Sequence, residues 1–172
     1  RRFFGIGSQT DESDETSYTS KEIQVDLTAG IHLAQDIALM WSERFHQVRV
    51  EDGIIKSLPE IQEGFPTING IDGADIWGHR LTFRYDTRDR QLISTQGTYL
   101  NVSVEWNQNF KQHAVKDWWR TTIDARHLIP HFHNRLVFVS HAYADTVNGE
   151  TPPFYELPTL GGENTLRAFG RS

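Results

Sequence analysis

The stretch Glu22-Ile23-Gln24-Val25-Asp26-Leu27-Thr28-Ala29-Gly30-Ile31-His32-Leu33 decides the fold. Every second residue from Ile23 to Leu33 is apolar, and none of the residues between them is. A period of two places alternate side chains on opposite faces of a β-strand. Strands of soluble sheets usually have about 5–6 residues, whereas a strand that crosses a membrane at a tilt has about 9–11. The stretch therefore favours a membrane-spanning strand with one apolar and one polar face.

The same alternation recurs in three later segments, each with charges of both signs on its polar face. The apolar faces comprise Leu81, Phe83 and Tyr85; Leu100, Val102, Val104 and Trp106; and Trp119, Thr121, Ile123 and Ala125. A sheet of a soluble protein can show the same pattern, so alternation alone leaves both environments open. The length of the first run and the number of repeats favour the membrane.

Two segments alternate less clearly. In the first, the apolar residues follow one register up to Trp41, Glu43 interrupts it, and Val48 and Val50 follow the other register. This predicts either a β-bulge or a strand that leaves the membrane. The second segment, from Leu136 to Ala144, is apolar on both faces for half its length, so its register stays open.

Composition excludes several classes of protein. The 172 residues include 17 Lys and Arg against 23 Asp and Glu, and the net charge of −6 argues against nucleic-acid binding through a basic face. Without Cys, the chain has no disulfide, thiolate metal site or Cys nucleophile. Its apolar runs are far shorter than the about 18–20 residues of a membrane-spanning helix. A β-barrel stays compatible, because only one face of each strand must be apolar.

Seven strands are predicted, near residues 1–6, 18–33, 37–51, 76–86, 98–110, 115–127 and 134–146. Tight turns, such as 34–36 and 130–133, fall on one side of the sheet, and long loops, such as 8–17 and 53–74, fall on the other. Short periplasmic turns and long outer loops are typical of an outer-membrane barrel. Single-chain bacterial barrels have an even number of strands, so these seven are expected to be part of a larger barrel.

Three segments resemble motifs of one family. Pro158-Thr159-Leu160-Gly161-Gly162-Glu163-Asn164-Thr165-Leu166-Arg167-Ala168-Phe169 is similar to the signature loop of the Omp85 superfamily (surface antigen D15, BamA/TamA-like), where a Gly-Gly pair precedes a Val-Arg-Gly-Phe/Tyr tetrad. Tyr85-Asp86-Thr87-Arg88-Asp89, with Gly97 downstream, resembles the family's Tyr-Asp-Thr-Arg-Asp turn. Phe3-Phe4-Gly5-Ile6-Gly7 before an acidic loop is similar to the start of many such barrels.

The resemblance implies an all-β fold, a transmembrane antiparallel up-and-down β-barrel of sixteen strands, of which this chain contributes about seven. Residues 1–172 would then be one partial barrel domain, from about the fifth strand to the sixth outer loop, with no POTRA domain inside the chain. In the family this loop folds back into the lumen. The implied lumen-loop motif is Gly161, Gly162, Leu166, Arg167, Ala168 and Phe169, and the implied periplasmic turn motif is Asp86, Thr87, Arg88, Asp89 and Gly97.

Arg167 corresponds to the Arg of the tetrad. Its guanidinium could pin the loop by bidentate bonds to carboxylates of the lumen, although without the resemblance it would be read as a solvated loop residue. In the family the partners lie on later strands; the candidates inside this chain are Asp26, Asp86, Glu105 and Asp124. Ala168 replaces a Gly that can adopt a positive φ, which would cost about 1 kcal/mol if the loop needs that conformation.

No catalytic, cofactor or metal site is expected. The densest His group, His127 with His131 and His133, surrounds Pro130 in a turn, which argues against a fixed zinc geometry. The acidic run at residues 11–15 lacks the glycine and spaced ligands of a calcium loop, and no Gly-x-Ser-x-Gly elbow is present. An interfacial aromatic girdle would place tryptophans near the strand ends, although a soluble core would use them too. The five candidates are Trp41, Trp77, Trp106, Trp118 and Trp119.

The leading hypothesis is a non-enzymatic component of protein insertion or translocation in the outer membrane of a Gram-negative-type bacterium. It would act by strand-edge templating at a barrel seam outside this segment. Its expected partners are outer-membrane lipid and lipopolysaccharide, unfolded outer-membrane protein clients and accessory lipoproteins, with no nucleic acid. One alternative is a passive pore or the barrel anchor of a secreted domain, such as a patatin-like lipase. An alternative of another class is a soluble all-β ligand-binding protein related to lipocalin-like barrels.

Overall fold

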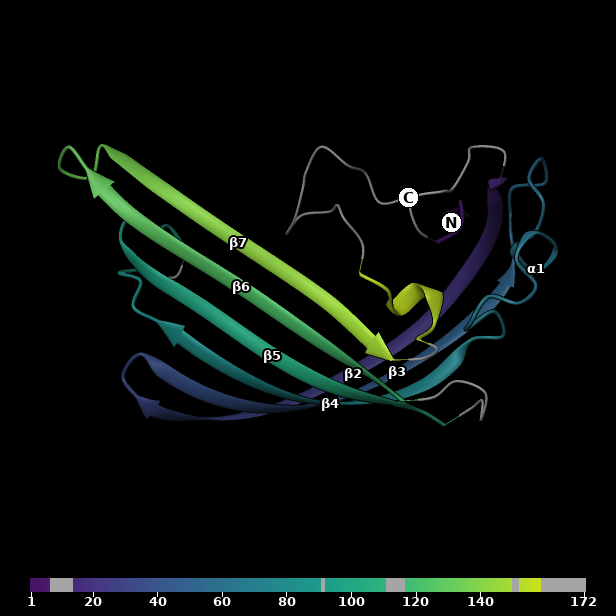
Figure 1. Ribbon diagram of the computed structural model, residues 1–172, viewed down its shortest axis with the longest axis horizontal. Helices are drawn as coiled ribbons and strands as arrows, with labels where there is room; N and C mark the ends of the chain where they lie inside the picture. Colours follow the sequence, from purple (N-terminus) through teal and green to yellow (C-terminus); the bar gives the residue numbers. More distant parts are fainter. Residues whose placement is uncertain (7–13, 91, 111–116, 150–151, 159–172) are drawn as a thin grey trace.

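Seven antiparallel strands form one curved sheet in the computed structural model, which describes residues 1–6, 14–90, 92–110, 117–149 and 152–158. The strands are β1 (Arg2–Phe3), β2 (Thr16–Ala34), β3 (Ile37–Asp52), β4 (Ala74–Asp86), β5 (Gly97–Asn109), β6 (Trp118–His131) and β7 (Leu136–Gly149). Each strand pairs with the next along the chain, which gives a half-barrel with a convex and a concave face (Figure 1). The prediction of seven up-and-down antiparallel strands is confirmed.

The strand boundaries differ most from the expected ones at the two ends of the sheet. The first strand, expected over residues 1–6, comprises only Arg2–Phe3, which pairs with the start of β2. β6 extends four residues beyond its expected end and includes Pro130, which pairs with Val137 of β7. The pairing with β5 already ends at Leu128, so the missing N–H of this proline leaves no gap in that ladder.

The convex face is apolar and exposed. Ile23, Leu27, Ile31 and Leu33 of β2 each expose between 59% and 69% of their surface. The convex sides of the following strands carry residues of the same kind, among them Leu81, Phe83, Val104, Ile123 and Ile129. A contiguous apolar surface of this kind requires an apolar environment. The alternation predicted for the membrane-spanning strands is therefore present in the sheet.

The β-bulge predicted within the second long strand is wrong. β3 pairs with β4 without a shift from Ile37 to Val48, and the register shift between β2 and β3 lies at the tight turn, between His32 and Ala34. Glu43 interrupts the apolar pattern because it stays on the convex face, whereas Val48 lies on the concave face and is fully buried there. The apolar convex face of β3 ends at Phe45, as expected of a strand that leaves the membrane.

The register of β7, which the sequence leaves open, follows from its pairing with β6. Phe138 pairs with Ile129 on the convex face, and Val139 pairs with Leu128 on the concave face. The turn between the two strands comprises Phe132, His133 and Asn134, which have φ angles of 49°, 59° and 65°. This stretch is therefore apolar on both faces only near the turn.

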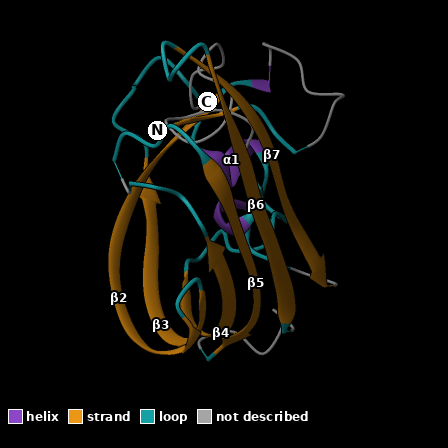
Figure 2. Cartoon of the chain, turned by 90° about the vertical axis from the view of Figure 1, so that its left-hand side faces the viewer, coloured by secondary structure: helices purple, strands orange, loops and turns teal. Residues whose placement is uncertain are grey.

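Two segments cover one end of the concave face (Figure 2). The first is the connection between β3 and β4, with the single-turn helix α1 (Ile61–Gly64), and the second includes the 3-10 turn η2 (Phe154–Glu156). They meet in a small core in which Phe154 packs against Tyr18 and Ile61, and the backbone N–H of Phe154 donates to Asn69 O at 3.0 Å. Neither described helix is long and apolar enough to span a membrane.

Candidate functional site

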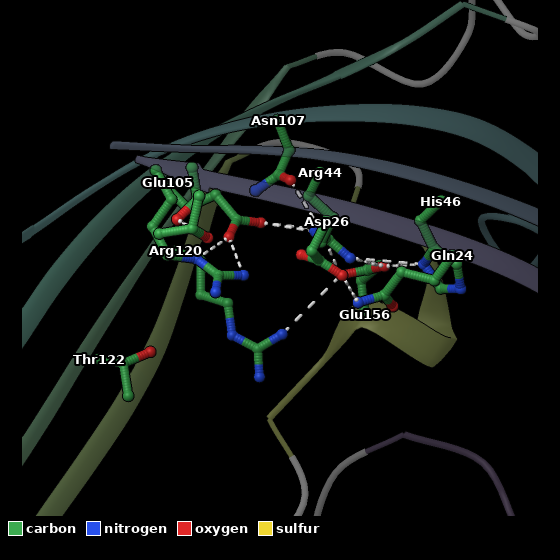
Figure 3. A network of polar contacts seen from close by, with 12 residues as sticks. Gln24, Asp26, Arg44, His46, Glu105, Asn107, Arg120, Thr122 and Glu156 are labelled. Carbon is green, nitrogen blue, oxygen red and sulfur yellow. Dashed lines mark hydrogen bonds and ion pairs between the residues drawn. The ribbon is translucent and has the colours of Figure 1, made fainter. Parts of the chain in front are cut away.

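A group of charged and polar side chains, the lumen network, gathers between the concave face of the sheet and the 152–158 segment (Figure 3). Its members are Arg44 and His46 of β3, Arg80 of β4, Glu105 and Asn107 of β5, Arg120 of β6, Asp145 of β7 and Glu156 of η2. The strand residues converge because the period of two directs each of them to the concave face. Only Glu156 comes from outside the sheet.

Glu156 fixes the 152–158 segment to the wall of the half-barrel. Its carboxylate accepts hydrogen bonds from Arg44 Nη1 at 3.0 Å and Nη2 at 3.2 Å, and lies 2.8 Å from His46 Nδ1. The residue is 4% exposed. Burial raises the pKa of this carboxyl, but the hydrogen bond with His46 and the charge of Arg44 outweigh it and lower the pKa to about 2. Glu156 is therefore a charged, fully partnered anchor.

Arg44 connects this anchor to the neighbouring strands. Its Nε donates to Glu105 Oε1 at 3.0 Å and its Nη2 to Asn107 Oδ1 at 2.7 Å. The other oxygen of Glu105 accepts from Arg80. Arg44 is 5% exposed and Glu105 is 1% exposed, so both charges depend on these partners. The network thus joins β3, β4 and β5 to η2.

Arg120 extends the network towards β7. It makes a bidentate pair with Asp145, with Nε–Oδ1 and Nη2–Oδ2 distances of 3.0 and 2.6 Å, and its Nη1 lies 3.8 Å from Glu156 Oε2. A cavity of ≈ 370 Å³ opens beside these side chains. Its lining comprises Gln24, Arg44, Arg80, Asn101, Ser103, Glu105, Arg120 and Thr122. The lining suits water or a polar chain segment.

Apolar contacts hold the same segment from its other side. Tyr155 packs against a buried cluster of Ala74, Ile76 and Trp118, and burial raises the pKa of its hydroxyl. Trp118 is fully buried on the concave face, so the prediction that it belongs to an interfacial girdle is wrong. Its neighbour Trp119 faces outward and is half exposed. The two adjacent tryptophans therefore lie in different environments.

Acidification is expected to release the 152–158 segment. The pKa of Glu156 is about 2 in the folded state against an ordinary value of 4.5, so the stability that its charge provides is complete above pH 4.5 and is lost as the pH falls towards 2. Protease cleavage near residue 152 should rise across this window. Glu156→Gln should show a flatter dependence over the same pH range, and equal curves for the two proteins would contradict the assignment.

The turn motif that resembles the family pattern closes the connection between β4 and β5. Asp86 accepts hydrogen bonds from the backbone N–H of Arg88 at 3.2 Å and from its Nε and Nη2, both at 2.8 Å. The Arg88 guanidinium lies 4.4 Å from the centre of the Tyr99 ring on β5. The backbone N–H of Thr87 donates to Thr98 O at 2.9 Å. These contacts tie the end of β4 to β5.

Asp89 and Gly97 complete this turn. Asp89 accepts from Thr95 Oγ1 at 2.7 Å and from the backbone N–H groups of Thr95 and Gln96, and the hydrogen bonds with Thr95 lower its pKa to about 2. Gly97 has a φ of 110°, and a Cβ there would lie 2.4 Å from Thr87 O. Any side chain at residue 97 would therefore displace the turn.

The lumen-loop motif (Gly161, Gly162, Leu166, Arg167, Ala168 and Phe169) lies outside the described residues. The four carboxylates considered as partners of Arg167 all have other contacts. Glu105 binds Arg44 and Arg80, Asp86 binds Arg88, Asp124 binds Arg126 and His141, and Asp26 accepts from Gln24 Nε2 at 2.6 Å. The role of Arg167 stays a prediction.

Arg44, His46 and Glu156 are site residues that no sequence motif indicated. The alternation of β3 continues past Glu43 without a bulge, and it places Arg44 and His46 on the polar face of the strand. A prediction without the bulge would therefore have assigned both residues to the concave face. Glu156 stands in Pro152-Pro153-Phe154-Tyr155-Glu156, where no period assigns a direction to its side chain. In the part of the chain that the structure describes, no three His, Asp or Glu residues are grouped so that they could hold a metal ion.

A curved up-and-down sheet with an apolar convex face and a polar, loop-covered concave face defines the wall of a membrane-spanning β-barrel. The family model of the Omp85 superfamily domain matches residues 2–172. The chain belongs to the Omp85 superfamily. This membership implies an outer-membrane location and, in general terms, a function in the insertion or translocation of outer-membrane proteins.

Proposed function

We propose that this chain forms part of the wall of a barrel that inserts other outer-membrane proteins by strand-edge templating. An unpaired strand edge in lipid leaves N–H and C=O groups without partners, which is costly. A barrel whose first and last strands pair weakly can offer such an edge to an incoming strand. In this proposal the seam lies outside this segment. The protein acts without catalysing a covalent reaction.

The docking of Glu156 is the observation that favours an insertion machine over a passive pore. A wide passive pore needs an open aqueous lumen. Here, a segment that follows β7 lies on the concave face, held by Arg44, His46 and the core around Phe154. A segment that is bound to the inner face of the sheet narrows the lumen. This favours a barrel that opens between two strands over one that works as an open pore. The clients we propose are unfolded outer-membrane proteins, with accessory lipoproteins as further partners.

Reconstitution tests this function. The protein in lipid vesicles should accelerate the folding of an urea-denatured outer-membrane barrel, measured by the heat-modifiable mobility of the client on gels. Empty vesicles and vesicles with an unrelated barrel are the controls. No acceleration, together with steady conductance in planar bilayers, would instead support the passive pore. A hydrolase domain linked to the barrel would support the anchor.

Arg167→Ala is expected to lower the temperature at which the barrel loses its compact, heat-modifiable mobility, because a guanidinium that pins the loop would be lost. Client folding in vesicles should slow in the same variant. Arg90→Ala, which removes an Arg from the connection between β4 and β5, is the matched control and should change neither property. Unchanged mobility and unchanged client folding in Arg167→Ala would remove Arg167 from the site.

A further inference from the structure

Glu43 is a carboxylate on the convex face of the sheet. It lies between Trp41 and Phe45 on β3, which are 48% and 44% exposed, and it pairs across the sheet with His79 of β4. On the next strand, Trp106 of β5 lies directly opposite His79. Side chains on this face meet the membrane, so Glu43 is a charge at the lipid-facing surface.

Three donors hold the carboxylate in place. Trp41 Nε1 donates to Oε1 at 2.7 Å, Trp77 Nε1 donates to Oε2 at 2.6 Å, and His79 Nδ1 lies 2.8 Å from Oε2. A carboxylate has about four acceptor positions, so these contacts leave one open. The Glu43 side chain is still 34% exposed, so a ligand can reach that position from the membrane side.

His79, which contacts Glu43, lies among three tryptophan rings. The ring centre of His79 lies 5.2 Å from that of Trp77, 6.3 Å from that of Trp41 and 5.6 Å from that of Trp106. Ring faces attract cations, most strongly when the ring is Trp. A fixed carboxylate with an open acceptor position beside tryptophan rings can bind an ammonium group, which donates the hydrogen bonds.

The basic side chain that contacts Glu43 is His79, and no Lys or Arg of the described convex face does so. The nearest such residues along β2 and β3 are Lys21 and Arg49, which pair with Glu51 at 2.7 Å and Asp75 at 2.8 Å. A charge at the lipid-facing surface is costly unless it is paired. With His79 as its basic partner inside the protein, Glu43 still has an acceptor position that a cation from the surroundings of the barrel can occupy.

We propose that Glu43, with Trp41 and Trp77, binds the primary ammonium group of a membrane lipid. Beyond Phe45, the convex side chains of β3 are polar, starting with Gln47, so the site lies where the apolar band ends and headgroups begin. Apolar residues such as Leu81 cover the convex face on the other side of the site, which suits an acyl chain. A primary ammonium has N–H donors for the open carboxylate position and a charge for the rings.

Native mass spectrometry of the intact protein tests the proposal. The protein is released from micelles that contain phosphatidylethanolamine, phosphatidylcholine or N-acetylated phosphatidylethanolamine at equal mole fractions. We expect about tenfold more retained phosphatidylethanolamine than N-acetylated lipid, which lacks the positive charge, and an intermediate value for choline, which lacks the N–H donors. Equal retention of all three lipids would overturn the proposal; a cationic side chain of a partner protein would then be the alternative occupant.

Glu43→Gln supplies the decisive variant, because it removes the charge and keeps the shape of the side chain. It should abolish the preference for phosphatidylethanolamine. Gln47→Ala removes a polar side chain from the same face of β3 and should keep the preference. Heat-modifiable mobility checks that both variants fold, and a retained preference in folded Glu43→Gln would contradict the assignment.

Discussion

Replacing Glu156 with alanine is expected to release the 152–158 segment from the concave face and to destabilise its docking by about 3–5 kcal/mol, the usual cost of breaking a buried ion pair. The change leaves the guanidinium of Arg44 and the ring of His46 buried without their shared partner. Limited proteolysis should then cut near residue 152 in the folded barrel. The temperature at which the compact gel mobility is lost should fall as well.

Glu51→Ala is the matched control for this experiment. Glu51 is also a paired carboxylate, 2.7 Å from Lys21, but its side chain is 48% exposed. Exposed pairs contribute about 0–1 kcal/mol, so this variant should resemble the parent protein. If both variants show the same proteolysis and the same transition temperature, Glu156 does not anchor the segment.

Trp118→Ala is expected to lower the free energy of unfolding of the sheet by about as much as Glu156→Ala weakens the docking of the 152–158 segment. The Trp118 side chain is fully buried and packs with Ala74 and Ile76 of β4 and with Tyr155 of η2. Truncating a buried aromatic residue to alanine costs about 3–5 kcal/mol, through lost apolar burial and the cavity left behind. Urea titration of the protein in micelles, followed by gel mobility, measures the loss.

Trp119→Ala provides an internal comparison one residue away. Trp119 is half exposed on the convex face, where it stacks on Trp106 with ring centres 6.2 Å apart. It loses little protein packing on truncation, so its effect should be the smaller of the two. A larger loss in Trp119→Ala than in Trp118→Ala would mean that the faces of β6 are assigned the wrong way round.

Alternation predicted most of the sheet because membrane-spanning strands must keep one face apolar along their length. The twelve residues from Glu22 to Leu33 lie in β2 with the expected facing. The alternation does not hold throughout β3. The convex face changes from apolar to polar, and the concave face changes from polar to apolar, at positions near Glu43. The convex face accepts a carboxylate there because two tryptophans and His79 bind it, and the concave face turns apolar because Val50 packs on the core around Ile61.

The lumen network was harder to predict than the strands. The alternation along each strand predicts that Arg44, Arg120 and Glu105 lie on one face of the sheet. It does not predict which element covers that face. Glu156 precedes the segment that resembles the family signature, and irregular backbone gives its side chain no predictable direction. The resemblance directed attention to Arg167, whereas the anchor that the structure describes stands eleven residues earlier.

The distance in sequence between Arg44 and Glu156 has a consequence for how the protein folds. The two residues are 112 positions apart, and five strands must form around the concave face before Glu156 can reach its partners. Contacts of such long range form slowly, because the chain between them must be ordered first. The docking of Glu156 is therefore expected to follow the pairing of β3, β4 and β5, which already brings Arg44 and Glu105 together.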